Sequence, residues 1–148
     1  MRVVLQRVKK AKVTVSSKII GEINKGLVIF LGVDKSDSQK DADYLAERIV
    51  NLRIFEDAQG KMNLSTQEVK GELLVVSQFT LLGNCKNGRR PSFDKAAQPN
   101  LAKELYNYFI KKLKEYSLSI ETGEFRAVMQ VELINDGPVT FILDSSDV

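Results

Sequence analysis

The stretch GELLVVSQFTLL, residues 71–82, indicates how this chain folds and where its chemistry lies. Leu73 to Val76 is a continuous apolar run, which is typical of a core strand, and we expect the strand to cover 72–79. Where the apolar run ends, the sequence changes to hydroxyl and amide side chains at residues 77–80. Strand ends on a rigid scaffold are places where proteins present such groups to a ligand.

Further predicted strands and two predicted helices make up the rest of the chain. The apolar run 27–33 predicts another strand that is buried on both faces. Apolar side chains at three- and four-residue spacing predict a helix over 37–52, capped by Ser36 or Asp37, and a second helix from Pro99. Other strands are expected at 3–8, 13–15, 19–23, 53–55, 125–133 and 139–143. This order predicts an α+β fold in one domain, residues 1–148, with a largely antiparallel sheet.

Composition excludes several kinds of chemistry. The 148 residues include no histidine and a single cysteine, Cys85. A Ser-His-Asp or Cys-His catalytic unit is therefore impossible within the chain, and we expect neither a metal nor another cofactor. The unpaired cysteine, the absence of an apolar run of about 20 residues and the absence of a signal-peptide pattern predict a cytoplasmic protein without a membrane segment.

The net charge of +3 comes from 22 basic and 19 acidic residues, and it leaves two interpretations open. Basic residues gather at 2–12, at 86–90 and at 111–114. A basic surface beside a site would favour a phosphate-bearing partner, whereas scattered lysines would only keep the surface solvated.

A second polar segment, NDGPVT at 135–140, separates the last two predicted strands. Asp136-Gly137 is a common hairpin turn, and proline often follows a turn. Gly137 has no side chain and Pro138 has no N–H donor, so carbonyl oxygens dominate the chemistry of this segment. The residues at 77–80 also allow two interpretations. Either their side chains simply end the strand by bonding nearby backbone, or freed backbone N–H groups stabilise an oxyanion beside a hydroxyl.

Both segments closely resemble the signature motifs of the D-aminoacyl-tRNA deacylase family. The resemblance continues over most of the chain, at MRVVLQRV (1–8), Gly26-Leu27, GRRPSF (88–93) and MQV (129–131). It implies a barrel-like, curled sheet with the helices packed outside, and a homodimer with its active sites at the interface.

The resemblance also implies a reaction, the hydrolysis of the ester between a D-amino acid and the terminal adenosine of tRNA. Gly-tRNA is a further expected substrate. Ser77, Gln78, Phe79 and Thr80 would form the catalytic segment, in which backbone groups stabilise the oxyanion and the ribose hydroxyl of the tRNA assists. We expect the Thr80 hydroxyl to position the substrate rather than attack it, because no base accompanies it. Phe79 would line the pocket for the terminal adenine, or else belong to the core.

Selectivity for the D-isomer is attributed by the resemblance to Gly137 and Pro138. Their peptide bond would be cis, and their carbonyls would enter the site of the partner subunit and exclude an L-amino acid. Arg7, Met129 and Asn135 are expected to support this element; the alternatives for the first two are a surface arginine and a core methionine.

One departure from the family concerns Arg126, because the family commonly has a glycine after the phenylalanine at Phe125. The departure bears on the local backbone and on a contact with tRNA, but not on the reaction.

Two other functions compete with this interpretation. One is a non-catalytic RNA-binding module, supported by the basic balance and by the loop at 86–90, although the chain lacks the aromatic signature of an RRM. The other is an editing domain of the same fold with another specificity, against which the intact Gly137-Pro138 argues.

Overall fold

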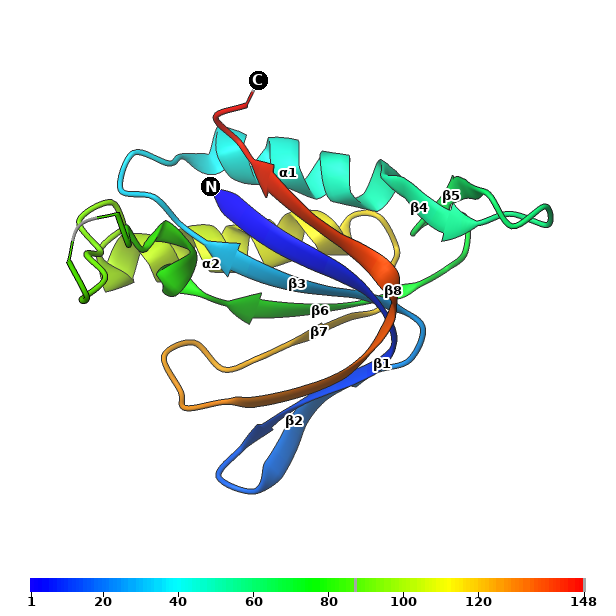
Figure 1. Cartoon of the computed structure of the whole chain (residues 1–148), viewed down its shortest axis with the longest axis horizontal. Helices are drawn as coiled ribbons and strands as arrows, with labels where there is room; N and C mark the ends of the chain where they lie inside the picture. Colours follow the sequence, from blue (N-terminus) through cyan, green and yellow to red (C-terminus); the bar gives the residue numbers. More distant parts are fainter. Residues whose placement is uncertain (87, 148) are drawn as a thin grey trace.

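The computed structural model describes residues 1–86 and 88–147; Asn87, inside the basic loop at 86–90, lies outside them. A six-stranded sheet curls through the molecule, and two helices pack on its outer face (Figure 1). In chain order the elements are β1 (Arg2–Val15), β2 (Lys18–Ile23), β3 (Gly26–Gly32), α1 (Gln39–Asn51), β4 (Arg53–Glu56), β5 (Met62–Ser65), β6 (Glu72–Ser77), the 3₁₀ helix η1 (Phe79–Leu82), α2 (Pro99–Lys114), β7 (Ile120–Thr122) and β8 (Gln130–Asp144).

The sheet is mixed: most of its pairing is antiparallel, as predicted, but parallel pairs occur as well. β1 pairs antiparallel with β2, β3 and β8, whereas β3–β6 and β6–β7 are parallel. The reason is connectivity. The chain passes through α1 between β3 and β6, and through α2 between β6 and β7, and such long crossovers return it to the same end of the sheet.

The curl brings the two ends of the sheet together, as the resemblance implies for a barrel-like fold (Figure 1). A Cβ atom added to Gly21 of β2 would lie 2.8 Å from the carbonyl oxygen of Thr122 in β7. Only a glycine permits this close approach of the two backbones.

Two apolar layers lie on opposite faces of the central strands. Leu27 and Ile29 of β3 pack with the helices in the outer layer, whereas Val28 belongs to the inner layer enclosed by the curl. β6 divides in the same way, since Leu73 lies in the outer layer and Leu74 in the inner one. The predicted burial of β3 on both faces and the predicted place of β6 in the core are therefore confirmed.

Some predicted boundaries are wrong near the polar segments. β6 ends at Ser77 and a 3₁₀ helix follows, so residues 77–80 do not alternate between two faces as in a strand. Residues 124–129 do not form a strand, because a turn occupies them and β8 starts at Gln130. β5 and β7 were not predicted.

The start of α1 also differs from the prediction. Its N-cap is Ser38 rather than Ser36 or Asp37. The backbone N–H of Ser38 donates to the Asp41 carboxylate at 2.8 Å, which satisfies one of the donors that the helix start leaves free.

The segment 135–140 is not a hairpin turn between two strands. It bulges from within β8, between two pairs of the ladder with β1, Gln6–Thr140 and Val8–Asn135. Between these two pairs β1 has one residue, Arg7, whereas β8 has four, residues 136–139. Four residues cannot pair with one, so they bulge out of the ladder.

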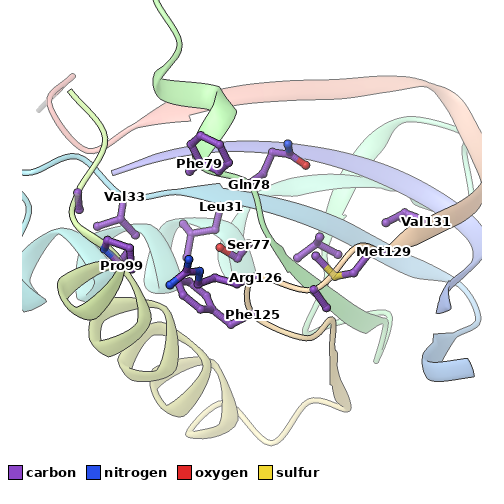
Figure 2. A pocket seen from close by; sticks show the side chains of 14 residues that line it. Leu31, Val33, Ser77, Gln78, Phe79, Pro99, Phe125, Arg126, Met129 and Val131 are labelled. Carbon is purple, nitrogen blue, oxygen red and sulfur yellow. The ribbon is translucent and has the colours of Figure 1, made fainter. Parts of the chain in front are cut away.

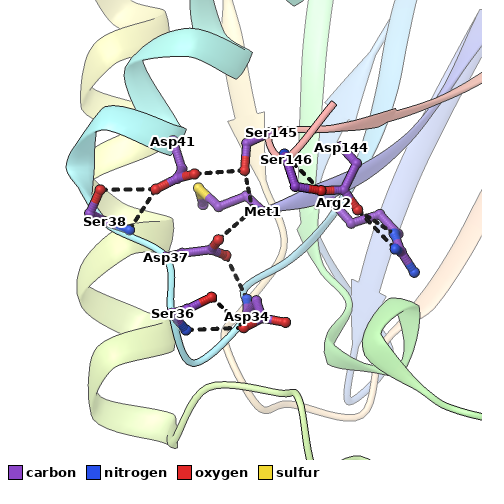
Figure 3. Close-up of polar contacts among 10 residues, drawn as sticks. All are labelled: Met1, Arg2, Asp34, Ser36, Asp37, Ser38, Asp41, Asp144, Ser145 and Ser146. Atoms are coloured by element: carbon purple, nitrogen blue, oxygen red, sulfur yellow. Dashed lines mark hydrogen bonds and ion pairs between the residues drawn. The ribbon is translucent and has the colours of Figure 1, made fainter. Parts of the chain in front are cut away.

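Polar contacts join the first and last strands near the chain ends (Figure 3). The Met1 ammonium donates to Asp37 and to Ser145, and Ser145 donates in turn to Asp41 at 2.7 Å. Arg2 donates to Asp144 at 2.9 Å and to the carbonyl oxygen of Leu81 at 3.1 Å. The second bond attaches η1 to β1. In the described part of the chain, no helix has the length and apolarity that crossing a membrane requires.

Candidate active site

A cavity of about 530 Å³ opens where β3 and β6 end (Figure 2). Its volume is in the range of small-ligand sites. The parallel register places Leu31 of β3 opposite Ser77 of β6, so the carboxyl ends of both strands reach the same wall. Most of the lining is apolar, from Leu31, Val33, Val76, Phe125, Met129 and Val131.

Three members of the predicted catalytic segment, Ser77, Gln78 and Phe79, line this cavity. The backbone N–H of Gln78 is engaged, since it donates to the carbonyl oxygen of Leu31 at 2.7 Å. Among the described residues, no backbone acceptor faces the N–H groups of Phe79 and Thr80, as is usual at the start of a helix. These two N–H groups can receive a negatively charged oxygen.

The fourth member, Thr80, is exposed and lies beside the cavity wall. Its hydroxyl oxygen accepts a hydrogen bond from the Gln78 side-chain amide. An amide N–H donor cannot take a proton from a hydroxyl, so this contact orients Thr80 without activating it.

Phe79 does not belong to the core, because 56% of its surface is exposed. Its ring meets that of Phe93 edge-to-face, with 5.0 Å between the centroids. The core alternative for Phe79 is therefore wrong, and the exposed ring is free to stack against a flat ligand group.

Helix α2 holds β6 in place beneath the cavity. The buried Tyr106 hydroxyl donates to the carbonyl oxygen of Val75 at 2.9 Å, two residues before Ser77. Burial raises the pKa of Tyr106, so the hydroxyl stays protonated and remains a donor.

A second group of predicted residues lies around Arg7. Only 5% of Arg7 is exposed, so the alternative that it is a surface arginine is wrong. Its Nε donates to the carbonyl oxygen of Asp136 at 2.9 Å and one terminal nitrogen donates to that of Ile54 at 2.6 Å. Asn135 donates to the carbonyl oxygen of Arg7 at 3.3 Å. The Gly137–Pro138 peptide bond is cis.

Within one chain the two groups do not share the cavity. Met129 lines it and packs against the inner apolar layer. Arg7, Asn135, Gly137 and Pro138 are not among the described residues that line it. Within one chain Met129 therefore lies apart from the Gly137–Pro138 element, and its support of that element in a partner subunit stays a prediction.

Sequence patterns did not reveal the walls that β3, α2 and the 124–127 turn supply. Leu31 could have been found from the parallel pairing of β3 with β6, since the carboxyl ends of parallel strands meet at one edge. Arg126 stood out only as a departure from the family, yet it lines the cavity with a backbone φ of +66°. Among the described residues, no cluster of three or more histidine, cysteine, aspartate or glutamate side chains could hold a metal ion.

Residues 4–144 match the family described as D-Tyr-tRNA(Tyr) deacylase. The chain belongs to this family. Its relatives include the D-aminoacyl-tRNA deacylase of Thermosipho africanus, 58% identical over 148 residues, which are 100% of this chain and 99% of that protein. The D-aminoacyl-tRNA deacylase of Geotalea uraniireducens is 59% identical over 145 residues, 98% of this chain and 94% of that protein. Membership confirms the predicted class of enzyme, a hydrolase that cleaves an ester.

Solved structures agree on the fold. The c-Myc DNA Unwinding Element Binding Protein is 40% identical and superposes with a TM-score of 0.91 over 97% of this chain and 98% of its own. A probable eukaryotic D-amino acid tRNA deacylase superposes with a TM-score of 0.84 over 97% of this chain and 98% of its own. At 16% identity, the second likeness concerns the fold alone.

Proposed function

We propose that this deacylase hydrolyses the ester of D-aminoacyl-tRNA, releasing a free D-amino acid and tRNA. The observation that carries the proposal is the cavity at the end of β6, where Ser77 lies beside the N–H groups of Phe79 and Thr80 that have no backbone acceptor among the described residues. Such donors stabilise the oxyanion that forms when water adds to an ester carbonyl.

The reaction proceeds by positioning rather than by a strong protein base. Water adds to the ester carbonyl carbon, the carbonyl oxygen becomes an oxyanion, and the ribose oxygen leaves with the proton that the water gives up. A neighbouring ribose hydroxyl of the tRNA relays that proton. Because the ester is already reactive, correct placement and oxyanion binding supply the main rate increase. A chain with no histidine is suited to this mechanism.

Exclusion of the L-isomer is assigned to Gly137 and Pro138 of a partner subunit. Both residues are exposed on β8, and the same strand carries exposed apolar side chains before and after them, with 47% of Ile134, 37% of Phe141 and 70% of Ile142 accessible. A patch of this kind favours contact with a second copy, and a two-fold dimer would carry the bulge of one subunit to the cavity of the other.

Rigid backbone atoms are well suited to exclude the L-isomer. The D- and L-isomers carry identical groups, so only a rigid obstacle near the α-carbon separates them. Two hydrogen bonds tie the bulge to Arg7 of β1, one from the Arg7 side chain to the Asp136 carbonyl oxygen and one from the Asn135 side chain to the Arg7 carbonyl oxygen, and they supply the rigidity. A barrier of this kind ignores the side chain, so many D-residues and achiral glycine should pass it.

The test compares D-Tyr-tRNA, L-Tyr-tRNA and Gly-tRNA as substrates. We expect rapid loss of the D-ester, slower loss of the glycine ester and no loss of the L-ester. Ala127→Phe, which fills the cavity, should abolish hydrolysis, whereas Arg48→Ala on the exposed face of α1 should not change it. Binding of all three with no ester lost would instead favour an RNA-binding module, and loss of the L-ester would favour an editing domain of other specificity.

A further inference from the structure

Arg126 occupies an unusual place in the turn between β7 and β8. The backbone N–H of Ala127 donates to the carbonyl oxygen of Glu124 at 3.2 Å, which closes a four-residue turn with Arg126 in third position. The φ of +66° at Arg126 belongs to the left-handed region. Turns with a positive φ at this position favour glycine or asparagine, because a Cβ atom is strained there. An arginine at this position is therefore unfavourable for the turn itself.

Contacts of the Arg126 side chain with the described residues do not offset this unfavourable backbone conformation. In the described part of the molecule, Arg126 forms no ion pair and no side-chain hydrogen bond, whereas Arg2 is paired with Asp144, and Arg7 with Glu56 and Asp136. Figure 2 shows the Arg126 side chain directed into the cavity, on the side of Phe125 and Ser77.

Arg126 also determines the charge of the cavity. Of the described residues that line it, Arg126 is the one with an ionised side chain. A cation beside an apolar wall, without an anionic partner, is suited to receive an anion from outside.

The substrate determines which anion this is. The amino acid carries a positively charged ammonium group, which an arginine would repel, and the ester is neutral. The anion closest to the ester is the phosphodiester on the 5′ side of the terminal adenosine. Guanidinium groups bind phosphate through two parallel hydrogen bonds.

We infer that Arg126 is a positioning residue that binds a phosphodiester group at the 3′ end of tRNA and so holds the terminal adenosine over the cavity. This inference rests on the proposed function, because it assigns a contact within the same site. The contact between Arg126 and the phosphodiester is electrostatic and does not depend on which base the nucleotide carries.

The test uses Arg126→Gly, which removes the charge and suits the positive φ, so no loss of thermal stability is expected. Arg126→Lys retains the charge, and Arg48→Ala removes an exposed cation of α1 that lies outside the cavity. Two substrates are compared, D-Tyr-tRNA and D-tyrosyl-adenosine, which has no phosphate.

For D-Tyr-tRNA we expect Arg126→Gly to raise KM about tenfold with kcat little changed. The plot of log(kcat/KM) against log[salt] should become less steep, by about 0.7, because one phosphate contact is lost. Arg126→Lys should recover most of the loss, and Arg48→Ala should have no effect. Hydrolysis of D-tyrosyl-adenosine should be the same in all variants. An equal loss with D-tyrosyl-adenosine would overturn the inference, because Arg126 would then act on the amino acid or the nucleoside. Unchanged kinetics with D-Tyr-tRNA would overturn it too.

A binding measurement separates this inference from the proposed function. An uncharged RNA hairpin ending in CCA should bind Arg126→Gly about tenfold more weakly than the wild type, with the smaller salt slope. Equal affinities would overturn the role of Arg126. If the wild type hydrolysed neither D-ester, the proposed function would fail, whatever the hairpin showed.

Discussion

The guanidinium of Arg7 is bound to the main-chain carbonyl oxygen of Asp136, with 2.9 Å between Nε and that oxygen. The same side chain donates to the carbonyl oxygen of Ile54, and it pairs with the carboxylates of Asp136 at 3.3 Å and Glu56 at 3.6 Å. One buried arginine of β1 thereby connects the bulge of β8 to β4. The residue that follows Asp136 is Gly137, so the position of the Gly137–Pro138 element depends on this contact.

Replacing Arg7 should damage activity more than folding. Arg7→Met leaves two carbonyl oxygens without their donor, and we expect the free energy of unfolding to fall by about 3 kcal/mol. Arg7→Lys should also lose at least about 100-fold in D-Tyr-tRNA hydrolysis, because one ammonium cannot reproduce the planar fork of donors. Denaturant unfolding and single-turnover deacylation measure the two effects. Lys9→Met, on the exposed side of the same strand, is the control. Full activity in a folded Arg7→Lys protein would contradict this role.

Arg7 also illustrates what sequence patterns do not reveal. A charged residue among alternating apolar ones indicates the solvent face of a strand, yet Arg7 is buried because the bulge of β8 and the strand β4 each supply a carbonyl oxygen to it. The bulge was itself hidden, since Asp136-Gly137-Pro138 has the composition of a turn. Both features depend on the pairing of β1 with β8, which are far apart in the chain.

Local patterns predicted the central elements well. The continuous apolar run at 27–33 and the helical periodicity at 37–52 correspond to β3 and α1 within a few residues. The strand predicted at 125–133 is wrong before Gln130, because a turn and the wall of a cavity can expose and bury successive residues as a strand does. Of the segment 77–80, the first three residues line the cavity, but local patterns did not predict the 3₁₀ helix that begins at Phe79 and is bonded to the distant Arg2 through Leu81.

Thr80→Ala should retain activity within about tenfold of the wild type, because its hydroxyl orients groups and is not activated as a nucleophile. Thr80→Ser should be nearly unchanged, and it serves as the matched control. Steady-state deacylation of D-Tyr-tRNA measures both variants, and mass spectrometry of quenched reactions searches for an acyl-enzyme. A covalent aminoacyl adduct on Thr80, or a loss above about 1000-fold, would contradict the positioning role.

Acid should weaken the contact between Asp144 of β8 and Arg2 of β1. Burial raises the pKa of Asp144, but hydrogen bonds from Ser146 and from Arg2 outweigh it and lower that pKa below 3.8. A lowered pKa means that the stabilisation is complete above the pKa of the unfolded chain and is lost as the pH falls through the folded value. We therefore expect Asp144→Asn to lower Tm by about 2–4 °C at pH 7 and to have a smaller effect near pH 2. Thermal unfolding across this range measures the difference. An equal effect at both pH values would contradict the assignment.

Gly137→Ala should lose far more activity than stability. The added Cβ atom would lie 2.9 Å from the backbone nitrogen of Val139, and closer still to the side-chain oxygen of Asn135. Relief requires Asn135 to leave its bond with Arg7 and the bulge to shift, so we expect a cost of about 1–3 kcal/mol in stability. A displacement above about 0.5 Å is enough to spoil a catalytic arrangement, and D-Tyr-tRNA hydrolysis should fall at least about 100-fold.

The control for Gly137→Ala is Gly60→Ala. The Cβ atom added at Gly60 meets no other atom, but the φ of +75° makes alanine strained there, so this variant also loses some stability. Because Gly60 lies in the turn between β4 and β5, away from the bulge, hydrolysis should stay at the wild-type level. A similar loss of activity in both variants would show that the effect comes from stability alone.

Mixing two inactive proteins tests whether Gly137 acts in the cavity of a partner subunit. One protein carries Gly137→Ala, and the other carries alanine at Gln78, Phe79 and Thr80. In a mixed dimer, the intact cavity of the first would meet the intact bulge of the second. A random 1:1 mixture would then recover about a quarter of the wild-type sites, since half of the two-fold dimers are mixed and each has one complete site. Differently tagged subunits establish the exchange independently of activity. Proven exchange without any recovered hydrolysis would contradict the cross-subunit arrangement.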